Sequence, residues 1–283
     1  MALTFHTFKF LEKLKHENHA FGRTLSIGRL NNLIKKDEFI KLNISFSDEL
    51  YADKILFNNF NLLSLNALDY SAFEEADIVH DLNKPIINVE KQFDTVLDFG
   101  TSEHVFDISQ CLKNISSLCK IEGIIIHCLP ANNNCGHGFW QFSPEVFFNI
   151  YSKKNGFCDT EIILINLFDR KYWYEVKRQE KGERLEINSA EPLYLLIKTK
   201  KIGQADYDKI NQSDYEHQWS NLEENKKIKK SFSSILNKKI KDSFKSALRN
   251  NIITKKYYNN FENYKLHKKN NFKNNKNLKK TLI

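Results

Sequence analysis

The feature that most constrains the fold is an alternation of short apolar runs with amphipathic stretches, from about Arg23 to Lys200. Such alternation is typical of βα units built around a largely parallel sheet. We therefore predict an α/β fold: a doubly wound, mostly parallel, seven-stranded sheet. The predicted strands are 24–27, 62–65, 76–80, 93–99, 124–129, 161–167 and 193–199.

Helices are predicted between several of these strands. Asp48–Asn59 and Val105–Leu118 carry apolar residues at three- and four-residue steps, which indicates helices packed on a sheet. Ser143-Pro144-Glu145 is typical of a helix start, with Ser at the cap and Pro at the first position. The last two strands suit an antiparallel hairpin at the sheet edge.

Charge is divided unevenly along the chain. The net charge is +8, but residues 225–283 hold 18 of the 43 Lys and Arg and only two of the 35 acidic residues. The basic character therefore belongs to the tail, where Lys226–Asn250 has the apolar spacing of a basic helix. The predicted organisation is an N-terminal extension 1–22, a domain 23–203, a basic helical extension 204–258 and a disordered tail 259–283.

Cysteine usage and hydropathy indicate a cytoplasmic chain with no transmembrane segment. The five cysteines have no C-x-x-C spacing, so we expect free thiols in a reducing compartment. No apolar run approaches the roughly 18 residues that a membrane span needs. The set Cys128, Cys135, His137 and His127 fits no usual zinc spacing, and we expect no metal.

Candidate functional residues stand at the predicted strand ends. In an open α/β sheet, ligands bind beyond the carboxyl ends of the strands, where the strand order reverses. The first strand ends in Ser26-Ile27-Gly28-Arg29, and a glycine there lets the backbone approach a ligand closely. The later strand ends to consider are Asn66–Asp69, Asp81–Asn83 and Phe99–His104.

Several of these stretches resemble class I S-adenosylmethionine-dependent methyltransferases. In that family the fourth strand ends in a small-residue turn and a Glu-His-Val element, as Phe99–Val105 does here. Lys120–Gly123 is similar to the family's Lys-Pro-Gly-Gly turn, and Leu129–Asn133 to the polar strand end that faces substrate. Cys135–Glu145 is similar to the Gly-His-Gly-Phe-Tyr-Gln-Phe-Ser-Pro-Glu signature of a bacterial subgroup. The likeness covers Thr24–Phe157 and implies a Rossmann-like methyltransferase sheet with S-adenosylmethionine as cofactor.

The resemblance also implies roles for individual residues. Asp81 would accept a hydrogen bond from the adenine amino group with Leu82 beside the ring, and Glu103 and His104 would face the reacting methyl. His104 and His137 are the candidate bases for a hydroxyl acceptor, since only histidine titrates near neutrality without perturbation. The implied cofactor-binding residues are Ser26, Gly28, Arg29, Asn66, Asp69, Asp81, Leu82, Asn83, Phe99, Gly100 and Thr101.

Each residue also has a plainer reading, and the family pattern is incomplete. Gly28, Asp81 and His137 would serve as turn residues, and His104 as a helix-start histidine. The first motif keeps only Gly28, and Asn66 stands where a ribose-binding acid is expected, with Asp69 as the nearest carboxylate.

We expect a methyltransferase that acts on a small molecule or a saccharide. One alternative is methylation of nucleic acid, with the basic tail contacting phosphates. Another is a catalytically silent methyltransferase-like protein that binds an anionic surface or partner through the tail; the missing glycines favour this reading, and the Glu103-His104 element opposes it. A nicotinamide enzyme is excluded because no G-x-G-x-x-G follows the first strand. The sequence does not indicate an oligomeric state.

Overall fold

A computed structural model gives the fold of the chain. It describes residues 1–87, 92–179, 183, 185–208, 210–212, 215, 217, 263–264, 266 and 271–283. Two compact units divide the chain: Met1–Arg178 with Ala190–Ile210 and Lys279–Ile283, and Gln179–Ser189 with Asn211–Leu278. Every residue of the candidate site belongs to the first unit.

The first unit is built on a nine-stranded mixed sheet with the order β11-β9-β8-β10-β7-β6-β2-β4-β5. The strands from β5 to β7 pair in parallel, and β10 is antiparallel to both β7 and β8. Counted along the chain, the five parallel strands lie in the order 3-2-1-4-5, as in doubly wound sheets, so the order reverses between β2 and β6. The strands are β2 (Arg23–Ile27), β4 (Ser64–Asp69), β5 (Ile78–Val79), β6 (Phe93–Asp98), β7 (Cys119–Pro130), β8 (Phe157–Asn166), β9 (Tyr172–Val176), β10 (Leu193–Lys201) and β11 (Leu278–Leu282).

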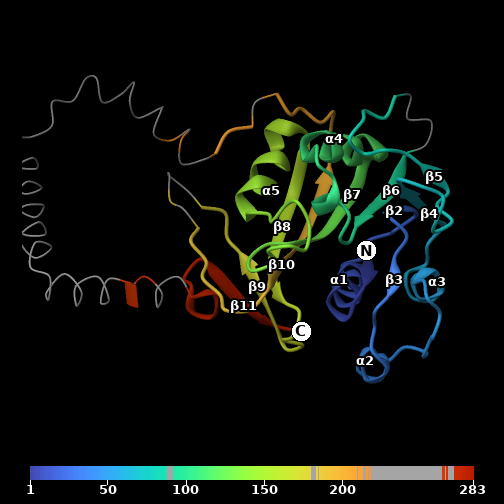
Figure 1. The fold of residues 1–283 in the computed structure, drawn as a ribbon, viewed down its shortest axis with the longest axis horizontal. Helices are drawn as coiled ribbons and strands as arrows, with labels where there is room; N and C mark the ends of the chain where they lie inside the picture. Colours follow the sequence, from blue (N-terminus) through green and yellow to red (C-terminus); the bar gives the residue numbers. More distant parts are fainter. Residues whose placement is uncertain are drawn as a thin grey trace, which may run out of the picture. The chain divides into compact units, whose positions relative to one another are not determined.

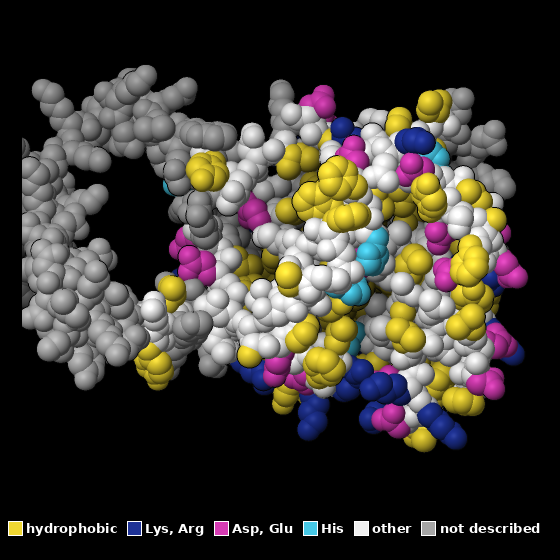
Figure 2. Space-filling model, viewed as in Figure 1, with side chains coloured by type: hydrophobic (Ala, Val, Ile, Leu, Met, Phe, Trp, Pro, Cys, Tyr) yellow, Lys and Arg dark blue, Asp and Glu magenta, His cyan; other side chains and the backbone are white. Residues whose placement is uncertain are grey.

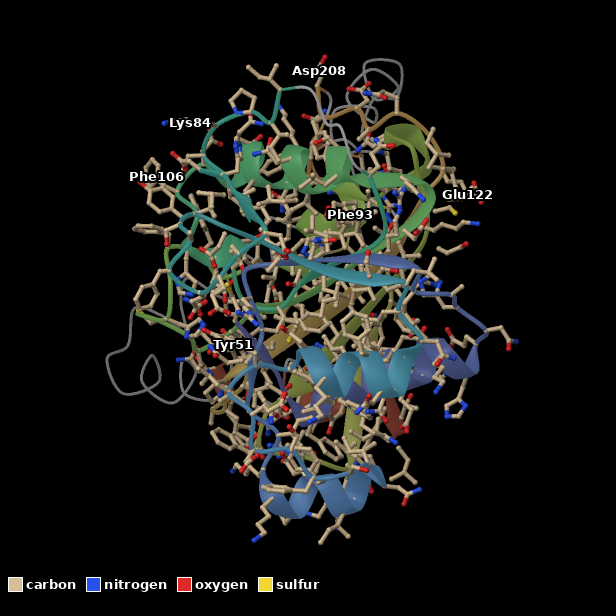
Figure 3. All side chains as sticks on the ribbon, turned by 90° about the vertical axis from the view of Figure 1, so that its right-hand side faces the viewer. Tyr51, Lys84, Phe93, Phe106, Glu122 and Asp208 are labelled. Atoms are coloured by element: carbon tan, nitrogen blue, oxygen red, sulfur yellow. The ribbon has the colours of Figure 1, made fainter. Side chains whose placement is uncertain are left out.

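Helices cover both faces of this sheet (Figure 1). α4 and α5 lie on one face, and α1 and α3 lie on the other (Figures 1 and 3). Asp107 caps α4 through a hydrogen bond from Gln110 N, which was not predicted. Ser143 caps α5 with Pro144 in its first turn, as the sequence predicted. The helices are α1 (Phe5–His16), α2 (Lys36–Leu42), α3 (Asp53–Phe60), α4 (Ile108–Leu118) and α5 (Pro144–Ile150).

The first 22 residues are part of the first unit, which corrects the prediction of an N-terminal extension. Thr4 caps α1, and β1 (Ala2–Leu3) pairs in parallel with β3 (Asn31–Asn32) in a separate small sheet. The apolar side of α1 is buried because its large side chains recur at helical spacing. Its buried apolar residues are Phe5, Phe8, Phe10, Leu11 and Leu14.

All seven predicted strands are present, but the second one is displaced. It runs over Ser64–Asp69 rather than 62–65, because its parallel register pairs Leu68 with Ile27 at the end of β2. The strand therefore ends at Asp69, beside the end of β2. The carboxylate of Asp69, which lay outside the predicted strand 62–65, is therefore at the end of β4.

The sheet also contains β9 and β11, which were not predicted. Leu278–Leu282 was expected to belong to a disordered tail and instead forms the edge strand β11. Ile283 N donates to Lys171 O at 3.0 Å, and Lys279 forms an ion pair with Glu175 at 3.4 Å. Pairing with the edge of β9 gives these polar residues a partner that sequence composition could not reveal.

His6, on α1, makes the stability of the fold depend on pH. Its side chain is buried, and its Nδ1 accepts a hydrogen bond from Trp173 Nε1 at 3.0 Å. Burial, aided by the charge of Arg170, lowers the pKa of His6 from 6.5 to about 4. Between these values the unfolded chain binds more protons, so the free energy of unfolding falls as the pH drops through this range.

We expect this residue to account for a loss of about 3 kcal/mol between neutral pH and pH 4. Urea unfolding at a series of pH values measures the loss. The comparison is His6→Asn, which keeps an acceptor near Trp173 and does not titrate. A variant with the same pH profile as the parent chain would contradict the assignment.

In the second unit, hydrogen bonds join the segment near Asn188 to the segment near Phe272. Phe272 N donates to Asn188 O at 3.0 Å, and Asn275 Nδ2 donates to Glu186 O at 2.7 Å. The predicted basic helix, Lys226–Asn250, lies outside the described residues. Within the described part of the chain, none of the helices has the length and apolar character needed to cross a membrane.

Candidate functional site

The carboxyl ends of β2 and β4 are joined directly. The amide of Gly28 donates to the carbonyl of Leu68 at 2.6 Å, which places Gly28 beside Asp69. Gly28 has φ +76°, a conformation that side-chain-bearing residues rarely adopt. The chain therefore turns away from β2 at Gly28, which is buried at the end of the strand.

The end of β6 is joined to the same place from the other side. Thr101 Oγ1 donates to the carbonyl of Ile27, the last residue of β2. Gly100, just before Thr101, has φ +96°. The ends of β2, β4 and β6 thus form one surface at the point where the strand order reverses. In Figure 3, the labelled Tyr51, Lys84 and Phe106 lie along one edge of this unit, and Glu122 lies at the opposite edge.

Met1 fills the space above the two glycines. A Cβ built on Gly28 would lie 1.6 Å from Met1 Sδ, and one on Gly100 would lie 3.7 Å from Met1 Cα. Ala2 N donates to Phe99 O at 3.1 Å, which ties this segment to the end of β6. A thioether therefore rests at the switch point of the sheet. Nothing in the sequence pattern indicated this placement.

A buried polar network beneath the surface shapes the turn after β6. Asp98 accepts hydrogen bonds from Ser102 Oγ at 2.6 Å and from His127 Nδ1 at 2.7 Å, and Tyr151 Oη donates to His127 Nε2 at 2.6 Å. Burial opposes ionisation of Asp98, but these hydrogen bonds outweigh it and lower its pKa. Asp98 also accepts from Thr101 N at 3.2 Å, so the carboxylate fixes the turn that carries the residues facing the site.

Glu103 is the most unusual titratable residue of the site. It lies in the 3-10 turn Ser102–His104, its side chain is fully buried, and neither carboxylate oxygen has a hydrogen-bond partner among the described residues. Burial and then the negative charge of Asp98 raise the pKa of Glu103 to about 8. Its Oε1 would lie 3.4 Å from a Cβ on Gly100, so the carboxyl group borders the space that Met1 occupies.

The loop after β7 brings His137 to this carboxyl group. His137 Nε2 lies 3.3 Å and His104 Nε2 4.0 Å from Glu103 Oε1, and the two imidazole rings are 5.4 Å apart. Burial and the neighbouring His137 lower the pKa of His104. Both histidines are exposed, and on the face shown in Figure 2 histidine side chains lie beside hydrophobic ones. The structure thus brings the three predicted catalytic residues together.

The predicted cofactor residues at the strand ends are only partly brought together. Met1 lies against Gly28 and Gly100, and the neighbouring Ala2 bonds to Phe99 O. Thr101 bonds to the end of β2. Asn66 lies inside β4 rather than at its end, which corrects the sequence-based position, and Asp69 takes its place. Ser26 is buried within β2 and donates to Asn66 O at 3.4 Å.

The turn after β5 contains Asp81, Leu82 and Asn83. Asp81 Oδ1 accepts from Asn83 N at 3.0 Å and from Asn83 Nδ2 at 2.8 Å, which is the turn arrangement of the plainer reading. Leu82 is buried, and Asn83 Oδ1 accepts from Asp107 N at 2.9 Å. These contacts hold the turn to the start of α4, while Asp81 Oδ2 forms an ion pair with Lys84 at 3.6 Å.

Arg29 points away from the glycines to the loop beyond β4. Its guanidinium group forms ion pairs with Asp53 at 2.9 Å and Glu75 at 2.6 Å, and lies 3.9 Å from the ring centroid of Tyr51. With these partners, Arg29 joins the start of α3 to the loop after β4. A ligand contact from its side chain would require breaking this arrangement.

The chain is similar in structure to methyltransferases, at low sequence identity. A SAM-dependent methyltransferase from Archaeoglobus fulgidus has 15% identity and a TM-score of 0.39, over 69% of this chain and 94% of that one. The N-methyltransferase NodS from Bradyrhizobium japonicum has 12% identity and a TM-score of 0.40, over 70% and 97%. A possible histamine N-methyltransferase from Thermotoga maritima has 17% identity and a TM-score of 0.33, over 70% and 91%. No family model and no curated sequence matches the chain.

Proposed function

We propose that this chain is an S-adenosylmethionine-dependent methyltransferase that acts on a small-molecule or saccharide acceptor. The observation that carries the proposal is the meeting of three strand ends around Gly28 and Gly100, with a methionyl thioether resting between them. This is the position at which doubly wound sheets bind their ligands. The resemblance of Phe99–Val105 and Cys135–Glu145 to methyltransferase motifs supports the same assignment.

The residues present fit the cofactor. Gly28 and Gly100 leave a cradle that any Cβ would fill, and the side chain that rests there carries a thioether sulfur, as S-adenosylhomocysteine does. Asp69, at the end of β4, offers a carboxylate to the two ribose hydroxyls. When bound, the cofactor supplies a methyl group already activated on a sulfonium.

The acceptor side is formed by Glu103, His104 and His137. Methyl transfer is an in-line displacement, so alignment of the reactants contributes more than a general base does. His104 and His137 stand beside the cradle and can take a proton from an acceptor hydroxyl. The exposed rings of Phe106 and Phe139 pack edge to face at 5.8 Å and give the acceptor an apolar surface.

Calorimetric titration with S-adenosylmethionine and S-adenosylhomocysteine tests the proposal. We expect Asp69→Asn to weaken binding about five- to tenfold, because one acceptor of a ribose hydrogen bond becomes a donor. Asp159→Asn is the matched control. Asp159 lies near the start of β8, which four strands separate from β4 in the sheet, and its positive φ suits asparagine.

One observation favours the alternative of a catalytically silent protein. The side chain of Met1 fills the cradle that the cofactor needs. The same titrations decide between the two, since a folded chain that ignores both ligands at millimolar concentration is not a methyltransferase. Binding through the basic tail, whether to nucleic acid or to an anionic surface, concerns residues that lie mostly outside the described part of the chain.

A further inference from the structure

Three metal-ligating side chains converge beside Gly100. Within the described residues, one ligand atom from each of Glu103, His104 and His137 lies within 4.8 Å of the others. Around one cation with bonds of about 2.1 Å, ligand atoms lie roughly 3 to 3.5 Å apart. The 3.3 Å separation of His137 Nε2 from Glu103 Oε1 already meets this value, and the 4.0 Å separation of His104 Nε2 is close to it.

The carboxylate of Glu103 is the observation that points to a bound ligand in this cluster. Glu103 is 0% exposed, and both of its oxygens lack a hydrogen-bond partner among the described residues. Buried polar groups in folded proteins almost always have a partner, because leaving one unpaired costs free energy. The two histidine side chains are 51% and 45% exposed, so a cation held here would keep an open side toward solvent.

The loop that carries His137 is fixed to the turn that carries the other two residues. The amides of Phe139 and Trp140 both donate to Glu103 O, at 2.8 and 3.3 Å, and Trp140 Nε1 donates to Val105 O at 2.9 Å. A Cβ on Gly138 would lie only 2.8 Å from Glu103 O, so glycine permits this close approach. The three side chains are therefore held together by the backbone rather than by chance contact.

We propose that Glu103, His104 and His137 form a binding site for a divalent transition-metal ion, with zinc as the best fit. Two imidazoles and one carboxylate are a known zinc ligand set that leaves a fourth position free. This proposal departs from the expectation of no metal, and it shares only His137 with the cysteine-containing set considered from the sequence. His127 of that set is committed to Asp98 and Tyr151.

Resting on the proposed function, the open position would take the hydroxyl oxygen of the acceptor. A metal ion makes a bound hydroxyl more acidic, so its proton leaves to water. With zinc bound, His104 and His137 act as ligands and not as bases. The oxygen then forms a bond to the methyl carbon as the carbon–sulfur bond breaks. The electron pair of that bond goes to sulfur, giving S-adenosylhomocysteine and a methyl ether. The proposal therefore favours an alcohol as acceptor, rather than an amine.

Titration of the full chain with zinc chloride alone tests the site. We expect about one zinc ion per chain, and His137→Ala and Glu103→Gln should each weaken binding by about tenfold or more. His16→Ala, at the exposed end of α1, is the matched control and should leave the affinity unchanged. Cobalt in place of zinc should give the visible absorption of a four-coordinate site.

Absence of saturable zinc binding overturns the proposal, as does binding that survives both substitutions. His137 is exposed on a loop, so His137→Ala decides the question even where Glu103→Gln impairs folding, which far-ultraviolet circular dichroism would show. Titration with S-adenosylhomocysteine is carried out separately. Zinc binding without binding of that ligand would keep the metal site and reject the methyltransferase.

Discussion

Replacing Met1 by glycine is expected to tighten the binding of S-adenosylmethionine by about tenfold. Met1 Sδ occupies the space directly above Gly28, and its side chain packs partly buried against the core. Partial burial of such a side chain stabilises the conformation in which Met1 fills the cradle by about 1.5 kcal/mol. The cofactor has to displace the Met1 side chain in order to bind. That free energy corresponds to about a factor of ten in the apparent dissociation constant.

The variant can be prepared from a cleavable fusion that leaves glycine at position 1, and the affinity measured by calorimetry. Met1→Leu is the matched control, because leucine keeps an apolar side chain of similar size in the cradle and should bind like the parent chain. Equal affinities of the parent chain and Met1→Gly would show that Met1 and the cofactor do not compete.

Asp98→Asn is expected to lower the free energy of unfolding by about 3 kcal/mol. The carboxylate accepts from Ser102 Oγ and His127 Nδ1 at full burial. An asparagine of the same size turns one of its oxygens into a donor and removes the charge. Breaking a buried charge-assisted network costs about 3 to 5 kcal/mol, because the remaining partners stay buried without an acceptor.

Urea unfolding followed by fluorescence measures this loss. Asp107→Asn is the matched control: Asp107 caps α4 through Gln110 N, and asparagine caps a helix about as well as aspartate. We expect the control to change the free energy of unfolding by less than about 0.5 kcal/mol. A loss below about 1 kcal/mol for Asp98→Asn would mean that the network does not hold the turn after β6.

The strand-end positions of the candidate site could be predicted, but the distances between side chains could not. Gly28, Gly100 and Glu103 follow apolar runs, and the carboxyl ends of parallel strands meet at one edge of a sheet. His137 and Glu103 are far apart in the sequence, and their 3.3 Å contact depends on a loop whose amides bond to Glu103 O. The buried pair Asp98 and His127 left only a weak signal, two polar residues in otherwise apolar strands.

The sequence by itself determined the alternation of strands and helices, the cap of α5, and the presence of seven strands. These depend on neighbouring residues, whose spacing and cap chemistry can be read directly. Only the tertiary structure decided that Asp69 ends β4, that Met1 lies on Gly28, and that β11 closes one edge of the sheet. Register and docking of this kind are set by contacts between residues distant in the chain, which local patterns do not encode.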